Sequence, residues 1–227
     1  MSKNYSRLYI KDFNWKKRLW QFWAVYCLLM PIFWFFYRYE IRGRHNIPKN
    51  KKFICAANHI SYFDPFLVSI ALRKPLAFMA KQELFENPAL AKLLSNLAAF
   101  AVNREKLEVS TIKTVKDIMK TNWLLGIFPQ GGIKRNHIIE DLNKGAAVIS
   151  KTSKTDILPI AITGCEEYNW IPFRAKIIVE IGEIVSHNQE TEEIINEWGE
   201  KVARMANYEF IPTYYQTEES EQKIKVS

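Results

Sequence analysis

Short apolar runs alternate with helical patterns along most of the chain, and this alternation limits the possible folds more than any other feature. Apolar runs that predict strands occupy residues 39–42, 53–57, 77–80, 100–103, 124–128, 158–163 and 177–181. Helical patterns occupy residues 65–72, 88–97, 109–122, 142–151 and 192–206. Alternating strands and helices pack as layers, so we expect an α/β fold, with a mixed, largely parallel sheet flanked by helices.

A long aromatic and apolar run, LWQFWAVYCLLMPIFWFFY, precedes this region at residues 19–37. Gln21 is its one strongly polar residue, and Pro31 interrupts it. A straight helix of this length measures roughly 28 Å, which is marginal for a hydrocarbon core of roughly 30 Å. Three interpretations stay open: a single span, a pair of short helices broken near Pro31 that enters one leaflet, or a buried helix of a soluble core.

These patterns divide the 227 residues into three parts. We expect residues 1–38 to form a helical membrane anchor, residues 39–212 to form the folded domain, and residues 213–227 to form a flexible polar tail. The three cysteines form no Cys-x-x-Cys pair and the four histidines show no ligand spacing, so we expect neither a disulfide framework nor a metal site.

The formal net charge of +8 suits an anionic membrane surface, a phosphorylated substrate or nucleic acid. The chain carries no signature of a nucleic-acid-binding fold, so we expect no nucleic-acid partner. The charge alone does not choose between the other two partners.

The stretch NHISYFDP at residues 58–65 places a histidine and an aspartate just after an apolar run. A strand followed by an Asp-Pro helix start, with Asp64 as N-cap and Pro65 at the first helical position, puts His59 on the intervening turn. An imidazole can take a proton from a hydroxyl, and it does so better when a carboxylate fixes its tautomer. The pair therefore predicts a general base, His59, oriented by Asp64. The alternative is that Asp64 only caps a helix and His59 is an ordinary turn residue.

Basic and glycine residues follow other predicted strands. Lys81 and Arg104 lie at strand ends, where parallel sheets open toward ligands, and either can grip a phosphate. Gln130, Gly131 and Gly132 follow an apolar strand, and their permissive backbone can turn N–H groups toward an anion or a developing oxyanion. By position alone, solvated cations at strand ends and an ordinary strand-to-loop turn are the more common explanations of these residues.

Four blocks together resemble the motifs of the glycerolipid acyltransferases, in the lysophosphatidic acid acyltransferase branch. They are NHISYFD at 58–64, KQELF at 81–85 with FAVNR at 100–104, FPQGG at 128–132, and LPIAI at 158–162. The resemblance covers roughly residues 40 to 185. It departs from the family pattern FPEGTR, because Gln130 replaces the glutamate, Gly132 the threonine and Ile133 the arginine. Lys134 or Arg135 could take the place of the missing arginine.

The resemblance implies an acyltransferase domain over residues 39–212. That domain would move a fatty acyl group from acyl-CoA or acyl carrier protein to a hydroxyl of a lysophospholipid, most simply 1-acylglycerol-3-phosphate. It also implies catalytic roles for His59 and Asp64, acceptor binding by Lys81, Arg104 and residues 130–132, and no cofactor. It favours the pair of helices in one leaflet, with a membrane lipid as partner and the active site on the cytoplasmic side. Two alternatives stay open: a non-phosphorylated membrane alcohol or glycolipid as acceptor, and an inactive lipid-binding protein.

Overall fold

The computed structural model describes residues 5–103, 108–165 and 176–213. Its helices are α1 (Trp15–Phe22), a π-helical segment (Trp23–Leu29), α2 (Met30–Phe36), α3 (Asp64–Leu72), α4 (Pro88–Asn96), α5 (Val109–Met119), α6 (Gly145–Ser153) and α7 (Thr191–Ala206), with short 3₁₀ turns at Ile10–Asp12, Arg44–Asn46 and Gln82–Phe85. Its strands are β1 (Glu40–Arg42), β2 (Ile54–Ala57), β3 (Leu76–Lys81), β4 (Phe100–Val102), β5 (Leu124–Ile127), β6 (Ile138–Ile139), β7 (Ile157–Thr163), β8 (Ile178–Ile181) and β9 (Glu209–Phe210).

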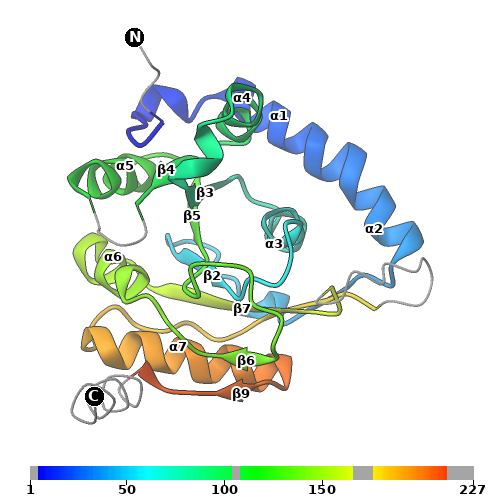
Figure 1. Cartoon of the computed structure of the whole chain (residues 1–227), viewed down its shortest axis with the longest axis vertical. Coiled ribbons are helices and arrows are strands. Elements are labelled where there is room, and N and C mark those ends of the chain that lie inside the picture. The colour runs from blue at the N-terminus through cyan, green and yellow to red at the C-terminus, as the bar shows by residue number, and fades with distance from the viewer. Residues whose placement is uncertain (1–4, 104–107, 166–175, 214–227) are drawn as a thin grey trace, which may run out of the picture.

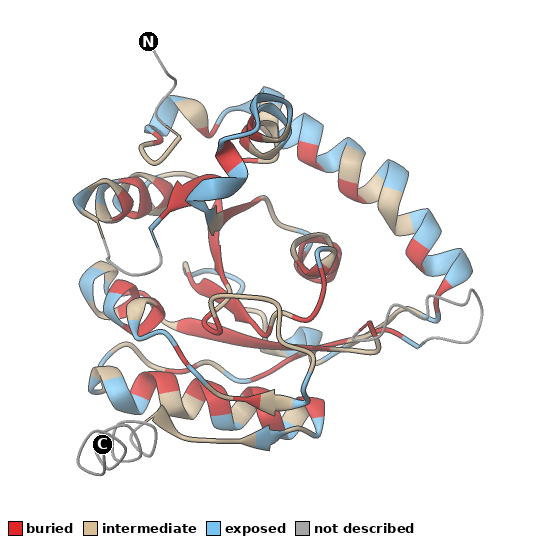
Figure 2. Cartoon of the chain, viewed as in Figure 1, coloured by how far each residue is buried: buried red, intermediate tan, exposed pale blue. Residues whose placement is uncertain are grey.

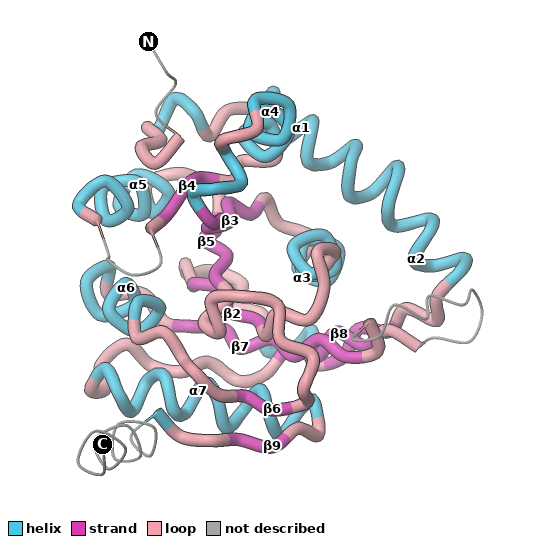
Figure 3. The backbone as a smooth tube through the Cα atoms, viewed as in Figure 1, coloured by secondary structure: helices cyan, strands magenta, loops and turns pink. Residues whose placement is uncertain are grey.

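Seven of the described strands form one sheet in the order β1-β8-β7-β2-β5-β3-β4. Neighbouring strands run parallel except for the antiparallel pair β7 and β8. The predicted mixed, largely parallel sheet is therefore confirmed. A second, two-stranded sheet of β6 and β9 lies beside α7 (Figure 3) and was not predicted, because strands of two residues are too short to show a hydrophobic period.

Alternate residues of the central strand face two separate cores. Ile54 and Ala56 of β2 pack in a core with residues of α5, α6 and α7, whereas Cys55 and Ala57 pack in a core with residues of α3 and of the N-terminal helices. Figure 1 shows these two groups of helices on opposite sides of the sheet. Because both faces of the sheet are covered, its strands are almost continuously apolar, as the sequence pattern required.

The N-terminal helices form one continuous helical run, Trp15–Phe36, rather than a pair separated near Pro31 (Figure 3). The predicted break was wrong because the π-helical turns that precede Pro31 accommodate the proline ring without interrupting the helix. Met30 N–H bonds to the carbonyl of Val25, five residues back. Such widened turns leave room for a proline ring that would clash with the carbonyl four residues back in a regular helix.

This run packs lengthwise against the domain while its other side stays exposed (Figure 2). The Gln21 amide donates to the carbonyl of Leu76 over 2.7 Å and accepts from the N–H of Leu76 over 3.0 Å. The Tyr26 hydroxyl donates to the carbonyl of Ser69 over 2.9 Å. The polar residue that interrupts the apolar run therefore fastens the helix to strand β3 of the domain.

Candidate active site

The turn that carries His59 follows directly from the end of strand β2. Asn58 is fully buried, its amide donates to the carbonyl of Ile162 over 2.9 Å, and it accepts from the N–H of Ile162 over 2.7 Å. These two bonds replace the backbone ladder to β7 that the strand would otherwise continue. Asn58 thus ends the strand at a fixed point, and the next residue, His59, leaves the sheet at its carboxyl edge.

His59 and Asp64 lie in direct hydrogen-bond contact. The Nδ1 of His59 is 2.7 Å from Oδ2 of Asp64, and the Asp64 side chain is completely buried. The same oxygen accepts the N–H groups of Ile60 at 2.7 Å and Ser61 at 2.8 Å, while the thiol of Cys165 lies 3.8 Å from the other oxygen. Three nitrogen atoms therefore converge on one oxygen of this buried carboxylate.

The predicted N-cap role of Asp64 was wrong. Helix α3 begins at Asp64 itself, Phe63 occupies the cap position, and Pro65 is the second helical residue. The carboxylate turns back toward the preceding loop rather than forward to the first helical N–H groups. The interpretation of Asp64 as only a helix cap therefore loses its support, and the orienting role for His59 gains it.

The contact with Asp64 determines the tautomer of His59. A carboxylate can only accept, so Nδ1 must carry the proton, and Nε2 is left with a free lone pair. The His59 side chain is 14% exposed, and it lines the cavity described below. The arrangement can therefore take a proton from a hydroxyl placed in that cavity.

Gln130 supports the backbone of the turn that carries His59. It is buried, its Oε1 accepts the N–H of His59 over 3.1 Å, and its Nε2 donates to the carbonyl of Ile138 over 3.4 Å. An amide satisfies both partners, whereas a carboxylate could only accept. The glutamine that departs from the family pattern is thus matched to its surroundings in this chain.

Gly131 and Gly132 lie on the open wall of the cavity. Gly131 has a φ of +67°, and its N–H donates to the carbonyl of Phe128 over 3.0 Å. A left-handed turn of this kind suits glycine, and a side chain at either glycine would meet nothing within 4 Å. Because the turn itself uses the N–H of Gly131, that group is not available to an oxyanion in this conformation.

The two basic residues proposed to replace the missing arginine support the loop instead. The N–H of Lys134 donates to the carbonyl of His59 over 2.8 Å, and its ammonium group pairs with Asp141 at 2.9 Å. The guanidinium of Arg135 donates to the carbonyl of Ile60 over 3.1 Å. Both residues thereby connect the segment after the third block to the turn that carries His59.

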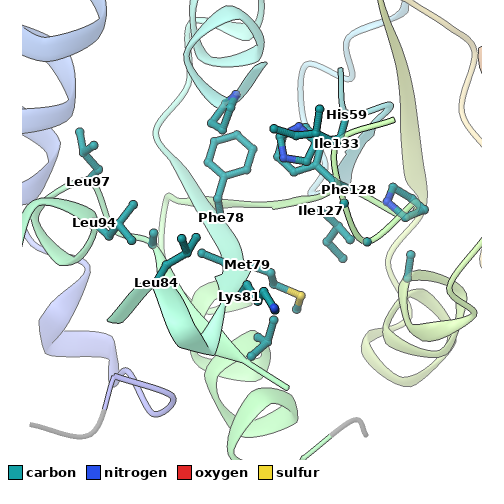
Figure 4. Close-up of a pocket in the computed structure, with 18 of the residues that line it drawn as sticks. His59, Phe78, Met79, Lys81, Leu84, Leu94, Leu97, Ile127, Phe128 and Ile133 are labelled. Carbon is teal, nitrogen blue, oxygen red and sulfur yellow. The ribbon is translucent and has the colours of Figure 1, made fainter. Parts of the chain in front are cut away.

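A cavity of about 400 Å³ opens beside His59 (Figure 4). Its walls are mostly apolar, with Leu84, Leu94 and Leu97 on the side of the N-terminal helices. Lys81 is the one Lys or Arg among the described residues that line it. A mainly apolar cavity with one cation and one imidazole suits an acyl chain that carries a polar head.

Of the two candidate phosphate-binding residues, the structure describes Lys81 but not Arg104. The ammonium group of Lys81 lies 3.0 Å from the carboxylate of Glu83, and about half of each side chain is exposed. Exposed pairs of this kind contribute roughly 0–1 kcal/mol, so a phosphate can displace the carboxylate easily. Arg104 lies outside the described residues, although Asn103, which precedes it, lines the cavity.

A second histidine–aspartate pair lies at the opposite edge of the sheet. Nδ1 of His187 is 2.6 Å from Asp156, whose other oxygen lies 2.8 Å from the ammonium group of Lys51. Burial raises the pKa of the Asp156 carboxyl, but hydrogen bonds from Lys51 and His187 outweigh that effect and lower the pKa to about 2. None of the three residues is in the lining of the cavity, and the lowered pKa of Asp156 means that this pair contributes to the stability of the fold.

An aromatic stack beside the imidazole was missed by sequence reasoning. The ring of Phe128 stacks on the imidazole of His59, with centroids 4.2 Å apart and planes 19° apart. Phe78 stacks on Phe128 in turn, at 5.6 Å and 12°. Phe128 stood within the third quoted block, but the contact joins three segments far apart in sequence and no local pattern announces it.

The known proteins that this chain resembles are acyltransferases. A family model described as Acyltransferase matches residues 38–163. The 1-acyl-sn-glycerol-3-phosphate acyltransferase of Bacillus subtilis (strain 168) is 29% identical over 145 residues, which are 63% of this chain and 72% of that protein. The protein of the same name from Streptococcus pneumoniae (strain ATCC BAA-255 / R6) is 31% identical over 144 residues, which are 61% of this chain and 53% of that protein. The chain thus matches about half the length of the second relative.

Among solved structures, the chain resembles the 1-acyl-sn-glycerophosphate (LPA) acyltransferase, PlsC, from Thermotoga maritima. The TM-score is 0.65 at 21% sequence identity, and the match covers 86% of this chain and 83% of that one. At this identity the likeness establishes a shared fold.

Proposed function

The chain belongs to the acyltransferase family, and from that membership we propose that it acylates 1-acylglycerol-3-phosphate in phospholipid biosynthesis. The acyl group comes from a thioester donor, either acyl-CoA or acyl carrier protein. One observation carries the proposal: a buried carboxylate holds His59 at 2.7 Å on the wall of a largely apolar cavity of about 400 Å³. The names of the relatives point to the same acceptor.

The reaction begins with proton removal by His59. Its Nε2 takes the proton of the acceptor hydroxyl as that oxygen bonds to the thioester carbonyl carbon. Asp64 stabilises the imidazolium that forms, because its Oδ2 lies 2.7 Å from Nδ1. The tetrahedral intermediate then expels the thiolate, which receives the proton from Nε2. The products are an ester and a free thiol, and no acyl-enzyme is needed.

Lys81 and Arg104 supply positive charge for the polar end of the substrates in this proposal. Lys81 lines the cavity, and its ion pair among the described residues is with a half-exposed carboxylate, so it can turn to the acceptor phosphate or to the developing oxyanion. Arg104 keeps its proposed role as the main phosphate ligand. This matters more because Ile133 occupies the position of the arginine in the family pattern.

The membrane supplies the acceptor in this proposal, through the helix Trp15–Phe36. Among the described residues this is the one helix long and apolar enough to cross a bilayer, and 17% of its apolar window is buried. Its exposed side carries Trp20, Trp23 and Trp34, and tryptophan favours the headgroup boundary. Because its other side is fastened to the domain, we propose that it lies in the plane of one leaflet with the active site on the cytoplasmic side.

The proposal is tested by following thiol release from acyl-CoA and from acyl carrier protein. The full chain is reconstituted in vesicles that contain 1-acylglycerol-3-phosphate, its dephosphorylated analogue or a glycolipid. We expect release that depends on the phosphorylated acceptor and is lowered by roughly 10²–10⁴-fold in His59→Ala, which removes the base. Release with none of the acceptors would favour an inactive lipid-binding protein, and a preference for an uncharged acceptor would favour the other alternative.

The acceptor phosphate is tested separately through Arg104→Ala. Loss of one charge-assisted hydrogen bond costs about 1.5–3 kcal/mol, so the acceptor KM should rise roughly 10- to 150-fold while the donor KM stays nearly constant. Lys113→Ala, at another cation of the chain that does not line the cavity, serves as the control for lost surface charge. Equal effects of Arg104→Ala on the phosphorylated and the dephosphorylated acceptor would rule out the phosphate contact.

A further inference from the structure

We propose that Phe78 is a positioning residue for His59, acting through the ring of Phe128 and dependent on the absence of a side chain at Gly126. This inference rests on the proposed function, because it needs His59 to be the base. It assigns a catalytic consequence to two residues, Phe78 on strand β3 and Gly126 on strand β5.

The hydrogen bond to Asp64 leaves the orientation of the imidazole incomplete. It fixes one atom, Nδ1, but the ring can still swing about the line that joins Nδ1 to Oδ2. Any swing moves Nε2, the atom that must meet the acceptor hydroxyl. A displacement of about 1 Å at a reacting group can cost roughly 10²-fold in rate. A second constraint on the plane of the ring is therefore required.

Phe128 supplies that second constraint. Its ring lies 4.2 Å from the imidazole at an angle of 19°, so the two planes restrict each other's rotation. The imidazole also gains positive charge when it takes the proton, and an aromatic face attracts a cation at this distance. The stack is thus more favourable in the transition state than in the resting enzyme.

Phe128 is half-buried at the cavity wall, so a second contact is needed to restrict the motion of its ring. Phe78 provides it, because its ring stacks on that of Phe128 at 5.6 Å and 12° and is 7% exposed. Figure 4 shows Phe78 on the cavity side of the sheet, within the same wall as Phe128 and His59. The three rings form a continuous stack that ends at the base.

Gly126 explains why the Phe78 ring can lie where it does. The two residues are paired in register on the neighbouring parallel strands β3 and β5. A Cβ built on Gly126 would come within 2.3 Å of Cε1 and 2.5 Å of Cδ1 of Phe78, which no real contact allows. The ring therefore occupies the space that any other residue at position 126 would fill.

The test is a double-mutant cycle with Phe78→Leu, Gly126→Ala and the double variant. Phe78→Leu removes the ring, and Gly126→Ala displaces it, so we expect each to lower kcat by roughly 10- to 100-fold with little change in acceptor KM. Both changes act on the same ring, so the double variant should be no slower than the slower single variant. Losses that multiply in the double variant, or an unchanged kcat in Phe78→Leu, would overturn the proposal.

Donor chain length separates positioning from a change in cavity shape. Phe78→Leu enlarges the cavity and Gly126→Ala does not, so a cavity-wall role predicts effects that differ between octanoyl-CoA and palmitoyl-CoA. Positioning predicts the same fractional loss of kcat with both donors. Phe53→Leu is the matched control, because Phe53 is fully buried in the same core but does not line the cavity. Its kcat should stay near that of the wild type.

Two variants of Phe128 test the proposal if the variants of Phe78 and Gly126 do not fold. Phe128→Leu removes the stacking ring, and Phe128→Tyr restores it. The proposal expects Phe128→Tyr to recover most of the kcat lost in Phe128→Leu, and equal losses in the two would refute it. Thiol release by the wild type, abolished in His59→Ala, tests the proposed function independently of every outcome above.

Discussion

Replacing Asp64 with asparagine separates the charge of this residue from its shape. The oxygen of the asparagine can take the place of Oδ2, which accepts from Ile60, Ser61 and Nδ1 of His59. The tautomer of His59 is therefore retained, and the loop keeps its hydrogen bonds. What disappears is the negative charge that faces the imidazolium once the hydroxyl proton has been taken.

The size of the effect follows from the geometry. With Nδ1 and Oδ2 2.7 Å apart, the centres of the two charges are roughly 4 Å apart, and they interact by about 4 kcal/mol at an effective dielectric constant of about 20. Each 1.36 kcal/mol changes the rate tenfold, so kcat should fall roughly 10³-fold. The acceptor KM should barely change, because Asp64 is fully buried and does not line the cavity among the described residues.

The assay is thiol release at saturating donor and varied acceptor, together with thermal unfolding of the same preparations. Asp64→Ala is the companion variant, because it removes both the charge and the accepting oxygen and should also lower the melting temperature. Turnover of Asp64→Asn within about tenfold of the wild type would show that the charge contributes less than about 1.4 kcal/mol. The carboxylate would then be only a structural acceptor for the loop, and the catalytic assignment would fail.

Three further predictions concern the rest of the molecule. Gln130→Glu places a carboxylate against the carbonyl of Ile138, so the free energy of unfolding in urea should fall by about 1–3 kcal/mol, whereas an unchanged value would exclude the amide contact. The double variant Trp20→Ser, Trp34→Ser changes two exposed side chains. If each ring contributes roughly 1.5–3 kcal/mol to lipid binding, vesicle binding measured by sedimentation should weaken by at least 10²-fold. The melting temperature should not change. The folded-state pKa of Asp156 is lowered from 3.8 to about 2. Its contribution to stability is therefore complete above about pH 4 and is lost as the pH falls toward 2. Over that pH range the urea midpoint of Asp156→Asn should fall less than the urea midpoint of the wild type.

The local elements could be predicted from the sequence because each depends on a local pattern. The long predicted strands and helices were found, because apolar periodicity and Asn-Pro or Asp-Pro starts are encoded within a few residues. The order of strands in the sheet was not predicted, since β1 pairs with β8 more than a hundred residues later. Such pairings depend on the packing of whole layers rather than on any short segment.

In the candidate site, too, a local contact was predicted from the sequence, whereas contacts between distant segments were not. The contact of His59 with Asp64 was predicted, because the two residues are five positions apart and the loop between them can close it. The direction of the Asp64 carboxylate was not, because a cap and a backward-facing acceptor share the same Asp-Pro sequence. The roles of Gln130 and Gly126 were also hidden, since each depends on a partner from another segment: Ile138 for the amide, and Phe78 for the missing side chain.

The attachment of the helix Trp15–Phe36 to the domain has a consequence for biosynthesis. The helix is synthesised before Ser69 and Leu76, the residues that its side chains bind. The sheet beneath it cannot close until β7 and β8, still later in the chain, have joined β2 and β1. During that interval a run of exposed aromatic side chains has no protein partner. On the proposal that this helix lies in one leaflet, the bilayer can bury these side chains before the domain exists, and the domain then folds onto a helix that is already at the membrane.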